Sequence, residues 1–164
     1  MKKLDGLAAT LILIGLVAGV AYLARDQEII AGFAEVIDGD SVRLEGRDIR
    51  IAGIDAPELR QTCFVQSGSY SCGDVARRAL GDMLAGRIAT CRVSGRDRYG
   101  RRLASCEAGG EDIGAALVSR GFAVAYGRYE REEAGARRQK LELWSGTFER
   151  PSEWRKAHSD QRRG

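Results

Sequence analysis

The chain of 164 residues has little histidine, proline or lysine: one histidine, two prolines and four lysines, against 22 arginines. The one histidine, His158, lies in a polar segment near the C-terminus. A Ser-His-Asp triad, a catalytic histidine pair or a histidine-bound metal therefore has no histidine in the body of the chain. The chain also lacks the G-K-[ST] sequence of phosphate-binding P-loops. Acid–base chemistry must come from carboxylates, tyrosines, lysines or cysteines.

The composition is that of an ordinary globular protein, with 44% hydrophobic and 30% charged residues. The formal net charge is only +3, so no strong overall field points to a nucleic-acid partner. The excess of arginine over lysine has two explanations. One is GC-rich codon usage; the other is phosphate binding, because a guanidinium can hold two phosphate oxygens at once.

The one long apolar run covers residues 6–24, with Lys2 and Lys3 before it and charged residues after it. Nineteen apolar residues are enough to span a bilayer as a helix, and a cleaved signal peptide is the alternative. Both place the rest of the chain outside the cytoplasm, in the cell envelope or secreted. We therefore predict an anchor or signal over 1–26, a linker over 27–32, a folded domain over 33–146 and a polar tail over 147–164.

Residues 36–58 form the stretch around which the domain is organised. Apolar and polar residues alternate over 42–44 and 49–51, which is typical of half-buried strands. Four carboxylates, Asp38, Asp40, Asp55 and Glu58, lie at the ends of these strands, with Arg50 between them in sequence. Such an oxygen cluster suits a hard divalent cation. Taken alone, Asp-Gly-Asp at 38–40 is more often an ordinary turn.

The rest of the chain predicts two further strands and three helices. We expect strands over 88–93 and 103–107, and helices over 74–86, over 111–121 and over 130–144, with a polar loop over 59–72 and loose chain beyond Trp154. Together with the strands expected at 36–37, 42–44 and 49–51, these elements predict an α+β fold. Its centre is a five-stranded OB-fold barrel packed with three helices and preceded by an N-terminal hydrophobic helix.

The four cysteines allow three pairings. Cys63 and Cys72 bound one loop, so a bridge between them would be local. If the hairpin turn is centred between residues 98 and 99, Cys91 lies directly opposite Cys106, where disulfide geometry is possible. We therefore predict Cys63–Cys72 and Cys91–Cys106, which an exported domain would retain. Free thiols are the alternative, and the spacings do not match a zinc site.

The turn Asp97-Arg98-Tyr99-Gly100-Arg101 could hold a second guanidinium near the carboxylates. Two arginines, a cation and a spare carboxylate suit phosphodiester hydrolysis, because fixed positive charge stabilises the charge that develops on the phosphate oxygens. A carboxylate can accept the proton of the attacking water.

Five short motifs occur in this order, none of them specific alone. They are V-I-D-G-D-S-V at 36–42, R-I-A-G-I-D-A-P-E at 50–58, D-R-Y-G-R at 97–101, A-L-V-S-R-G at 116–121 and L-W-S at 143–145. In this order and spacing the chain resembles the thermonuclease, or staphylococcal-nuclease-like, family over residues 33–146. The resemblance implies an OB-fold nuclease that requires calcium and cleaves DNA and RNA to 3′-phosphates.

The resemblance also implies roles for individual residues. Asp40 and Asp55 correspond to direct calcium ligands, together with the backbone carbonyl of Ala56, and Asp38 would support the site. Glu58 corresponds to the general base or the residue that positions the water. Arg50 and Arg101 would clamp the phosphate. Arg98, Tyr99 and Tyr126 would line the nucleotide pocket, with Tyr129 as the alternative second tyrosine.

The chain departs from the family pattern at a few positions. Ala56 stands where a hydroxyl residue is common, Arg98 replaces a frequent lysine, and the loop over 63–72 is an insertion. Two other functions stay open: an inactive OB-fold module that binds nucleic acid, and a calcium-stabilised interaction protein of the envelope. Residues 6–24 would contact the membrane if they are not cleaved, and the sequence indicates no protein partner.

Overall fold

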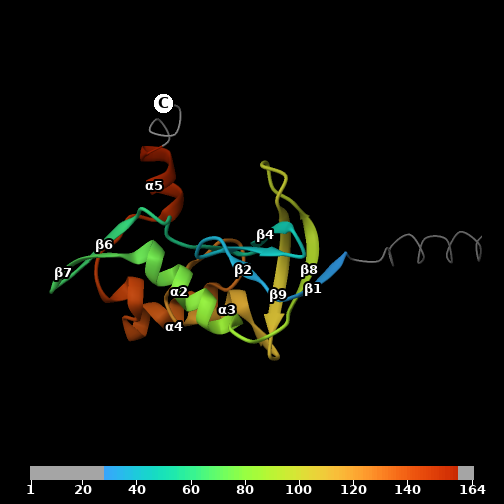
Figure 1. Cartoon of the computed structure of the whole chain (residues 1–164). Coiled ribbons are helices and arrows are strands. Elements are labelled where there is room, and N and C mark those ends of the chain that lie inside the picture. The colour runs from blue at the N-terminus through green and yellow to red at the C-terminus, as the bar shows by residue number, and fades with distance from the viewer. Residues whose placement is uncertain (1–27, 159–164) are drawn as a thin grey trace, which may run out of the picture.

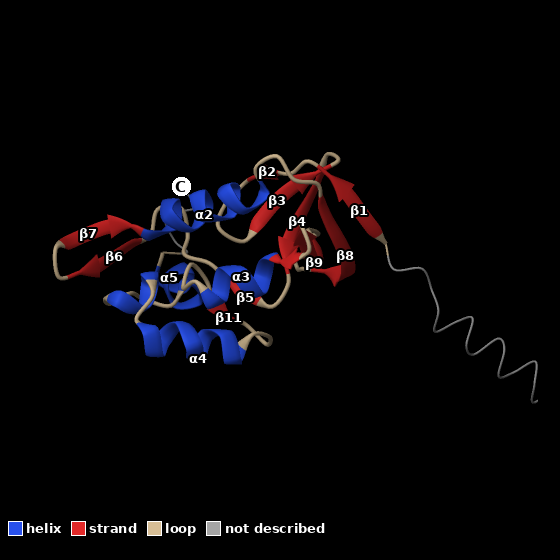
Figure 2. Cartoon of the chain, turned by 90° about the horizontal axis from the view of Figure 1, so that it is seen from below, coloured by secondary structure: helices blue, strands red, loops and turns tan. Residues whose placement is uncertain are grey.

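The computed structural model describes residues 28–158, and the predicted anchor or signal over residues 1–26 lies outside them. No helix within residues 28–158 is long and apolar enough to cross a membrane. The described part is a mixed α+β fold, as predicted, with the main sheet at one end and most of the helices beside it (Figures 1 and 2).

The main sheet has seven strands rather than five. Its order is β1-β8-β9-β4-β3-β2, with β10 paired to β9, and only the β4–β9 pair is parallel. The two strands that the sequence did not predict are β1, from the expected linker, and β10, from the expected start of the second helix. The strands are β1 Ile29–Gly32, β2 Glu35–Val36, β3 Ser41–Leu44, β4 Arg47–Ile51, β8 Ala89–Arg96, β9 Arg102–Ala108 and β10 Glu111–Asp112.

Four helices and one 3₁₀ turn complete the domain: α2 Cys72–Leu84, α3 Ile113–Ser119, α4 Glu130–Gln139, the 3₁₀ turn Glu142–Ser145 and α5 Pro151–Ala157. The predicted third helix ends early because Lys140 adopts a left-handed conformation (φ 52°) and Leu141 is extended. The expectation of loose chain beyond Trp154 was wrong as far as Ala157. Helix α5 starts with Pro151 at a position where the missing N–H costs nothing.

The predicted polar loop over 59–72 contains a hairpin, β6 Thr62–Val65 with β7 Gly68–Ser71. Its residues 62–71 include one Gly and three Ser, and their apolar side chains do not alternate with polar ones, so no strand pattern marks it. Phe64 also exchanges two backbone hydrogen bonds with Thr147, with N···O distances of 2.9 and 2.8 Å. The hairpin is thereby joined to the segment that leads into α5.

The register of the long hairpin confirms the predicted pairing of cysteines. Cys91 lies opposite Cys106 and the two are bonded, as are Cys63 and Cys72. The register shifts by one residue at Ser94, which forms a bulge before the turn.

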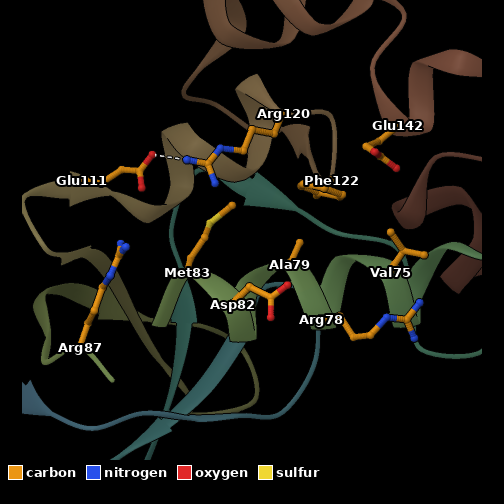
Figure 3. A pocket seen from close by; sticks show the side chains of 10 residues that line it. All are labelled: Val75, Arg78, Ala79, Asp82, Met83, Arg87, Glu111, Arg120, Phe122 and Glu142. Atoms are coloured by element: carbon orange, nitrogen blue, oxygen red, sulfur yellow. Dashed lines mark hydrogen bonds and ion pairs between the residues drawn. The ribbon is translucent and has the colours of Figure 1, made fainter. Parts of the chain in front are cut away.

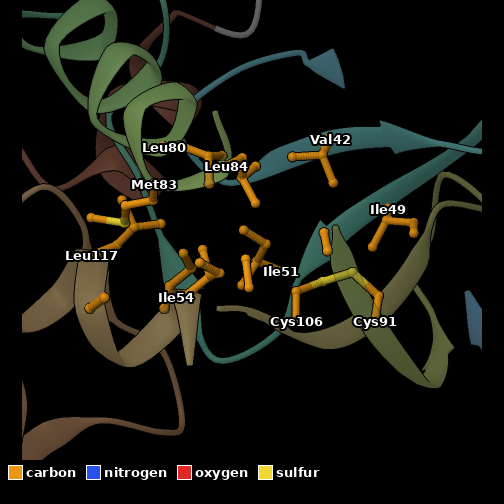
Figure 4. Packing of buried hydrophobic residues seen from close by; sticks show 14 of the residues in the cluster. Val42, Ile49, Ile51, Ile54, Leu80, Met83, Leu84, Cys91, Cys106 and Leu117 are labelled. Atoms are coloured by element: carbon orange, nitrogen blue, oxygen red, sulfur yellow. A yellow bond between two sulfur atoms is a disulfide. The ribbon is translucent and has the colours of Figure 1, made fainter. Parts of the chain in front are cut away.

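The core lies between this sheet and the helices (Figure 4). Ile49 and Ile51 of β4 point into it, because β4 alternates buried and half-exposed residues. They pack in one buried cluster with Leu80 of α2 and Leu117 of α3. The alternation leaves Arg50, between the two isoleucines, on the other side of the strand, toward the candidate site.

Candidate active site

Three strand ends meet to form the centre of the site. Ser41, the residue after Asp40, pairs with Arg50 across β3 and β4. Asp55 ends the short strand β5 Ile54–Asp55, which pairs with β11 Val124–Ala125. The two sheets therefore place Asp40, Arg50 and Asp55 beside one another.

The turn at 38–40 owes its shape to Asp38 and Gly39. The backbone N–H of Asp40 donates to Asp38 Oδ1 at 3.0 Å. A Cβ at Gly39 would lie 2.7 Å from the Cβ of Ala56 and 2.8 Å from that of Ala76, so only glycine fits there. Asp38 thus supports the turn that presents Asp40.

Arg50 joins the two buried carboxylates. Its Nη1 donates to Asp40 Oδ1 at 2.7 Å, and its Nη2 donates to Asp55 Oδ1 at 2.9 Å. The second oxygen of Asp40 accepts the backbone N–H of Ala56 at 3.1 Å. Two carboxylates buried this deeply need such partners.

The negative charge on Asp40 is only partly balanced. Burial raises the pKa of Asp40 from 3.8 to about 7, because it disfavours the charged form. The guanidinium of Arg50 and the N–H of Ala56 act in the opposite direction, while Asp38 and Asp55 add to the rise. A carboxylate in this state would gain from a further positive charge.

Glu58 is held by the loop that follows Pro57. Gln61, whose side chain is fully buried, accepts the backbone N–H of Glu58 at 3.2 Å and donates to the Glu149 carbonyl at 2.6 Å. Gly73, in the first turn of α2, packs so closely on the Glu58 carbonyl that any Cβ would overlap it. No sequence pattern indicates this role for Gln61.

Arg155 of α5 enters the cluster from the far end of the chain. Its Nη1 donates to Asp55 Oδ1 at 2.8 Å and to Glu58 Oε1 at 3.0 Å, and its Nη2 donates to Asp55 Oδ2 at 3.1 Å. Burial alone would lower the pKa of Arg155, but the hydrogen bonds to Asp55 and Glu58 outweigh it and raise the pKa. No sequence signal marks Arg155, which stands among other basic residues in the expected tail.

Arg101 reaches the cluster through Ser41. Arg101 Nη1 donates to Ser41 Oγ at 3.3 Å, and Ser41 Oγ donates to Asp40 Oδ1 at 2.9 Å. Asp97 orients Arg101 by accepting its Nε at 2.8 Å and its backbone N–H at 3.0 Å. Burial would raise the pKa of Asp97, yet these bonds lower it. The turn motif contains Asp97, but no sequence pattern indicates that Asp97 positions Arg101.

The predicted pocket residues are only partly brought together. Tyr99 is 70% exposed beside Arg98 and Arg101, whose guanidinium carbons lie 4.8 and 5.7 Å from its ring centroid. Tyr126, also 70% exposed, follows β11, and its backbone N–H donates to the Gly53 carbonyl.

Tyr129, the alternative pocket tyrosine, points elsewhere. Its hydroxyl lies 3.0 Å from both carboxylate oxygens of Asp112, at the start of α3. Burial, with the hydrogen bond to Asp112, raises the pKa of Tyr129 to about 12. This tyrosine therefore secures α3 and α4 rather than lining a nucleotide pocket.

The donor set suits a hard cation. Asp40 and Asp55 offer buried carboxylate oxygens, the ligand type that such a cation prefers. Among residues 28–158, no three His, Cys, Asp or Glu side chains are grouped for metal binding. Beyond the two carboxylates, a cation would need the Ala56 carbonyl and water. It would also compete with Arg50 and Arg155 for the same oxygens.

A separate hollow of about 520 Å³ contains none of these residues (Figure 3). Three arginines and three acids line it, and Arg120 donates to Glu111 at 2.6 Å. Because these charges balance, the hollow offers a polyanion no net attraction.

A family model described as "Staphylococcal nuclease homologue" matches residues 48–146, more than half of the chain. The chain belongs to this family. The matched range includes Arg50, Asp55, Glu58 and Arg101, whereas Asp40 and Arg155 lie outside it.

Curated relatives agree with the family. An uncharacterized endonuclease of Escherichia coli O157:H7 is 32% identical over 121 residues, covering 67% of the chain and 73% of that protein. The succinoglycan biosynthesis protein ExoI of Rhizobium meliloti (strain 1021) is 38% identical over 117 residues, covering 68% of the chain and 61% of that protein. A probable staphylococcal-like nuclease, CAN4, of Oryza sativa subsp. japonica is 28% identical over 66% of the chain and 22% of that protein. The chain thus spans less than two thirds of the last two.

Proposed function

We propose that this chain is a calcium-dependent nuclease that hydrolyses phosphodiester bonds of DNA and RNA with little sequence preference, leaving 3′-phosphates. The observation that carries the proposal is the buried Asp40–Arg50–Asp55 arrangement with Glu58 beside it. Family membership and the mixed α+β fold support the same conclusion.

The residues divide the work as follows. Asp40, Asp55 and the Ala56 carbonyl would hold calcium, which would supply a positive charge next to the phosphate. Glu58 would orient the water and accept its proton.

The two arginines would clamp the phosphate. When Arg50 turns from its carboxylate partners to the phosphate, its two Nη groups suit two phosphate oxygens. Arg101, oriented by Asp97, would approach the phosphate from the Ser41 side.

The alternative is an OB-fold module that binds nucleic acid without cleaving it. The presence of Arg50, Glu58 and Arg101 around Asp40 and Asp55 argues against it, because loss of activity would leave no reason to retain these two buried acids at such cost. We also propose that the domain works outside the cytoplasm, in the cell envelope or secreted, since both disulfides suit an oxidising compartment.

Cleavage assays on labelled DNA and RNA with the purified full chain test the proposal. We expect cleavage of both in calcium, none with chelator, and weaker activity in magnesium, which is smaller and stricter in geometry. Equal rates in magnesium and calcium would contradict the calcium assignment. Binding without cleavage under every condition would favour the inactive module.

A further inference from the structure

A second hollow, of about 470 Å³, lies where the β6–β7 hairpin meets α5. None of its lining residues has a role in the site described above. They are Arg60, Thr62, Phe64, Glu149, Trp154 and His158.

Aromatic rings dominate its walls. Phe64 leaves 56% of its surface exposed, because it alternates with the buried Cys63 along β6. Trp154 stacks on His158, with ring centroids 4.2 Å apart and planes within 17° of each other. Phe64 is exposed, whereas Trp154 and His158 are half-buried. Such rings around a hollow suggest a flat, partly apolar ligand.

The walls of this hollow are firmly joined. The Cys63–Cys72 disulfide closes the hairpin, and Phe64 is hydrogen bonded to Thr147 through both its backbone N–H and its carbonyl. The buried Gln61 side chain connects Glu58 to the Glu149 carbonyl. The hollow is therefore a built feature with a fixed relation to the Glu58 loop.

Chain connectivity keeps the hollow near the proposed catalytic cluster. Arg60 follows Glu58 by two residues, and Trp154 precedes Arg155, which donates to both Glu58 and Asp55. A strand whose phosphate lies at Arg50 would therefore pass Arg60 and the aromatic walls as it leaves the cluster.

We propose that this hollow binds one unpaired nucleotide of the substrate strand, adjacent to the cleaved phosphodiester. Its base would stack on the aromatic walls, and a phosphate would pair with Arg60. Stacking accepts any base, but it requires that the base is not in a duplex. The Glu149 carboxylate would keep a phosphate to the Arg60 side. This subsite rests on the proposed function and assigns a place to the nucleotide beside the cleaved bond.

Binding measurements separate the subsite from catalysis. The full chain carrying Glu58→Gln, in calcium, would be titrated with a fluorescent five-residue oligothymidylate and with a dinucleotide. Replacing Phe64 by Ala should weaken binding of the pentamer roughly tenfold, as loss of one stacked base does, and affect the dinucleotide less. Phe33→Ala is the matched control, because Phe33 is 68% exposed and lies outside the hollow.

Two further readouts cover other outcomes. Arg60→Gln should weaken pentamer binding several-fold and reduce its salt dependence, which tests the subsite even if Phe64→Ala fails to fold. A blunt duplex of the same length should compete poorly.

Pentamer binding that neither Phe64→Ala nor Arg60→Gln alters would overturn the subsite, as would absence of pentamer binding by the parent. Phe64-dependent binding by a wild-type chain that cleaves nothing would instead leave the subsite standing and overturn the nuclease.

Discussion

Arg50 and Arg155 each join two carboxylates of one cluster, but the chain holds them in different ways. Arg50 lies in β4, between β3 and β9, and bridges Asp40 and Asp55. Arg155 lies in a seven-residue helix near the C-terminus and bridges Asp55 and Glu58. The first guanidinium extends from the sheet, whereas the second extends from a short helix near the C-terminus. The comparison suggests that the sheet side, with Asp40 and Arg50, holds the metal and the phosphate, whereas the α5 side, with Arg155, adjusts access to Asp55 and Glu58.

The largest effect should come from Glu58, a carboxylate that Arg155 of α5 contacts. Glu58→Gln keeps the shape of the side chain but cannot accept a proton, so we expect kcat to fall by about 10² to 10⁴. Calcium binding, measured by calorimetry, should stay nearly intact. Asp40→Asn is the counterpart and should weaken calcium binding. A loss of calcium affinity in Glu58→Gln equal to that in Asp40→Asn would place Glu58 among the metal ligands.

The arginines on the sheet side should tolerate no lysine. Arg50→Lys and Arg101→Lys keep the charge but lose the planar fork, and loss of one preorganised donor costs roughly 10² in kcat. We would measure kcat and KM at two salt concentrations. Near-normal kcat in both variants would mean that these arginines only attract the polyanion, an effect that rising salt would weaken in variants and parent alike.

The two disulfides provide a further test of the comparison between the sheet side and the α5 side. Cys91–Cys106 joins core strands and closes 15 residues, so Cys91→Ala with Cys106→Ala should lower the free energy of unfolding by about 3 kcal/mol. Replacing Cys63 and Cys72 should cost less in denaturant unfolding, because that bridge spans only nine residues and lies outside the main core cluster. The rate of backbone amide hydrogen exchange should nevertheless rise in α5, because the hairpin that this bridge closes is hydrogen bonded to the segment leading into α5. Equal global losses from both pairs would contradict this division.

The sheet side was predictable from sequence because its information is local. Asp40, Arg50 and Asp55 lie within 16 positions, and the alternation of strands β3 and β4 defines which residues share a face. The pairing of Cys91 with Cys106 followed from one turn. Arg155 is 100 residues from Asp55, and no periodicity connects them. The end of α4 at Lys140 depends on a left-handed residue without glycine, and the β6–β7 hairpin depends on its pairing with Thr147.

The smallest expected effect tests Arg155 itself. Arg155 occupies both oxygens of Asp55, so an incoming calcium ion must compete with it. Arg155→Gln should therefore tighten calcium binding, roughly fivefold if the ion pair is worth about 1 kcal/mol, with kcat little changed.

Arg150→Gln is the matched control for Arg155→Gln. Arg150 immediately precedes α5 but pairs with Glu133, outside the cluster, at 3.2 Å. Calorimetry should give this variant the calcium affinity of the parent. In a Trp144→Phe background, Trp154 fluorescence should also change when calcium binds, because its neighbour Arg155 loses its partners. Weaker calcium binding in Arg155→Gln would mean that Arg155 positions Asp55 for the metal, and the two arginines would then act alike.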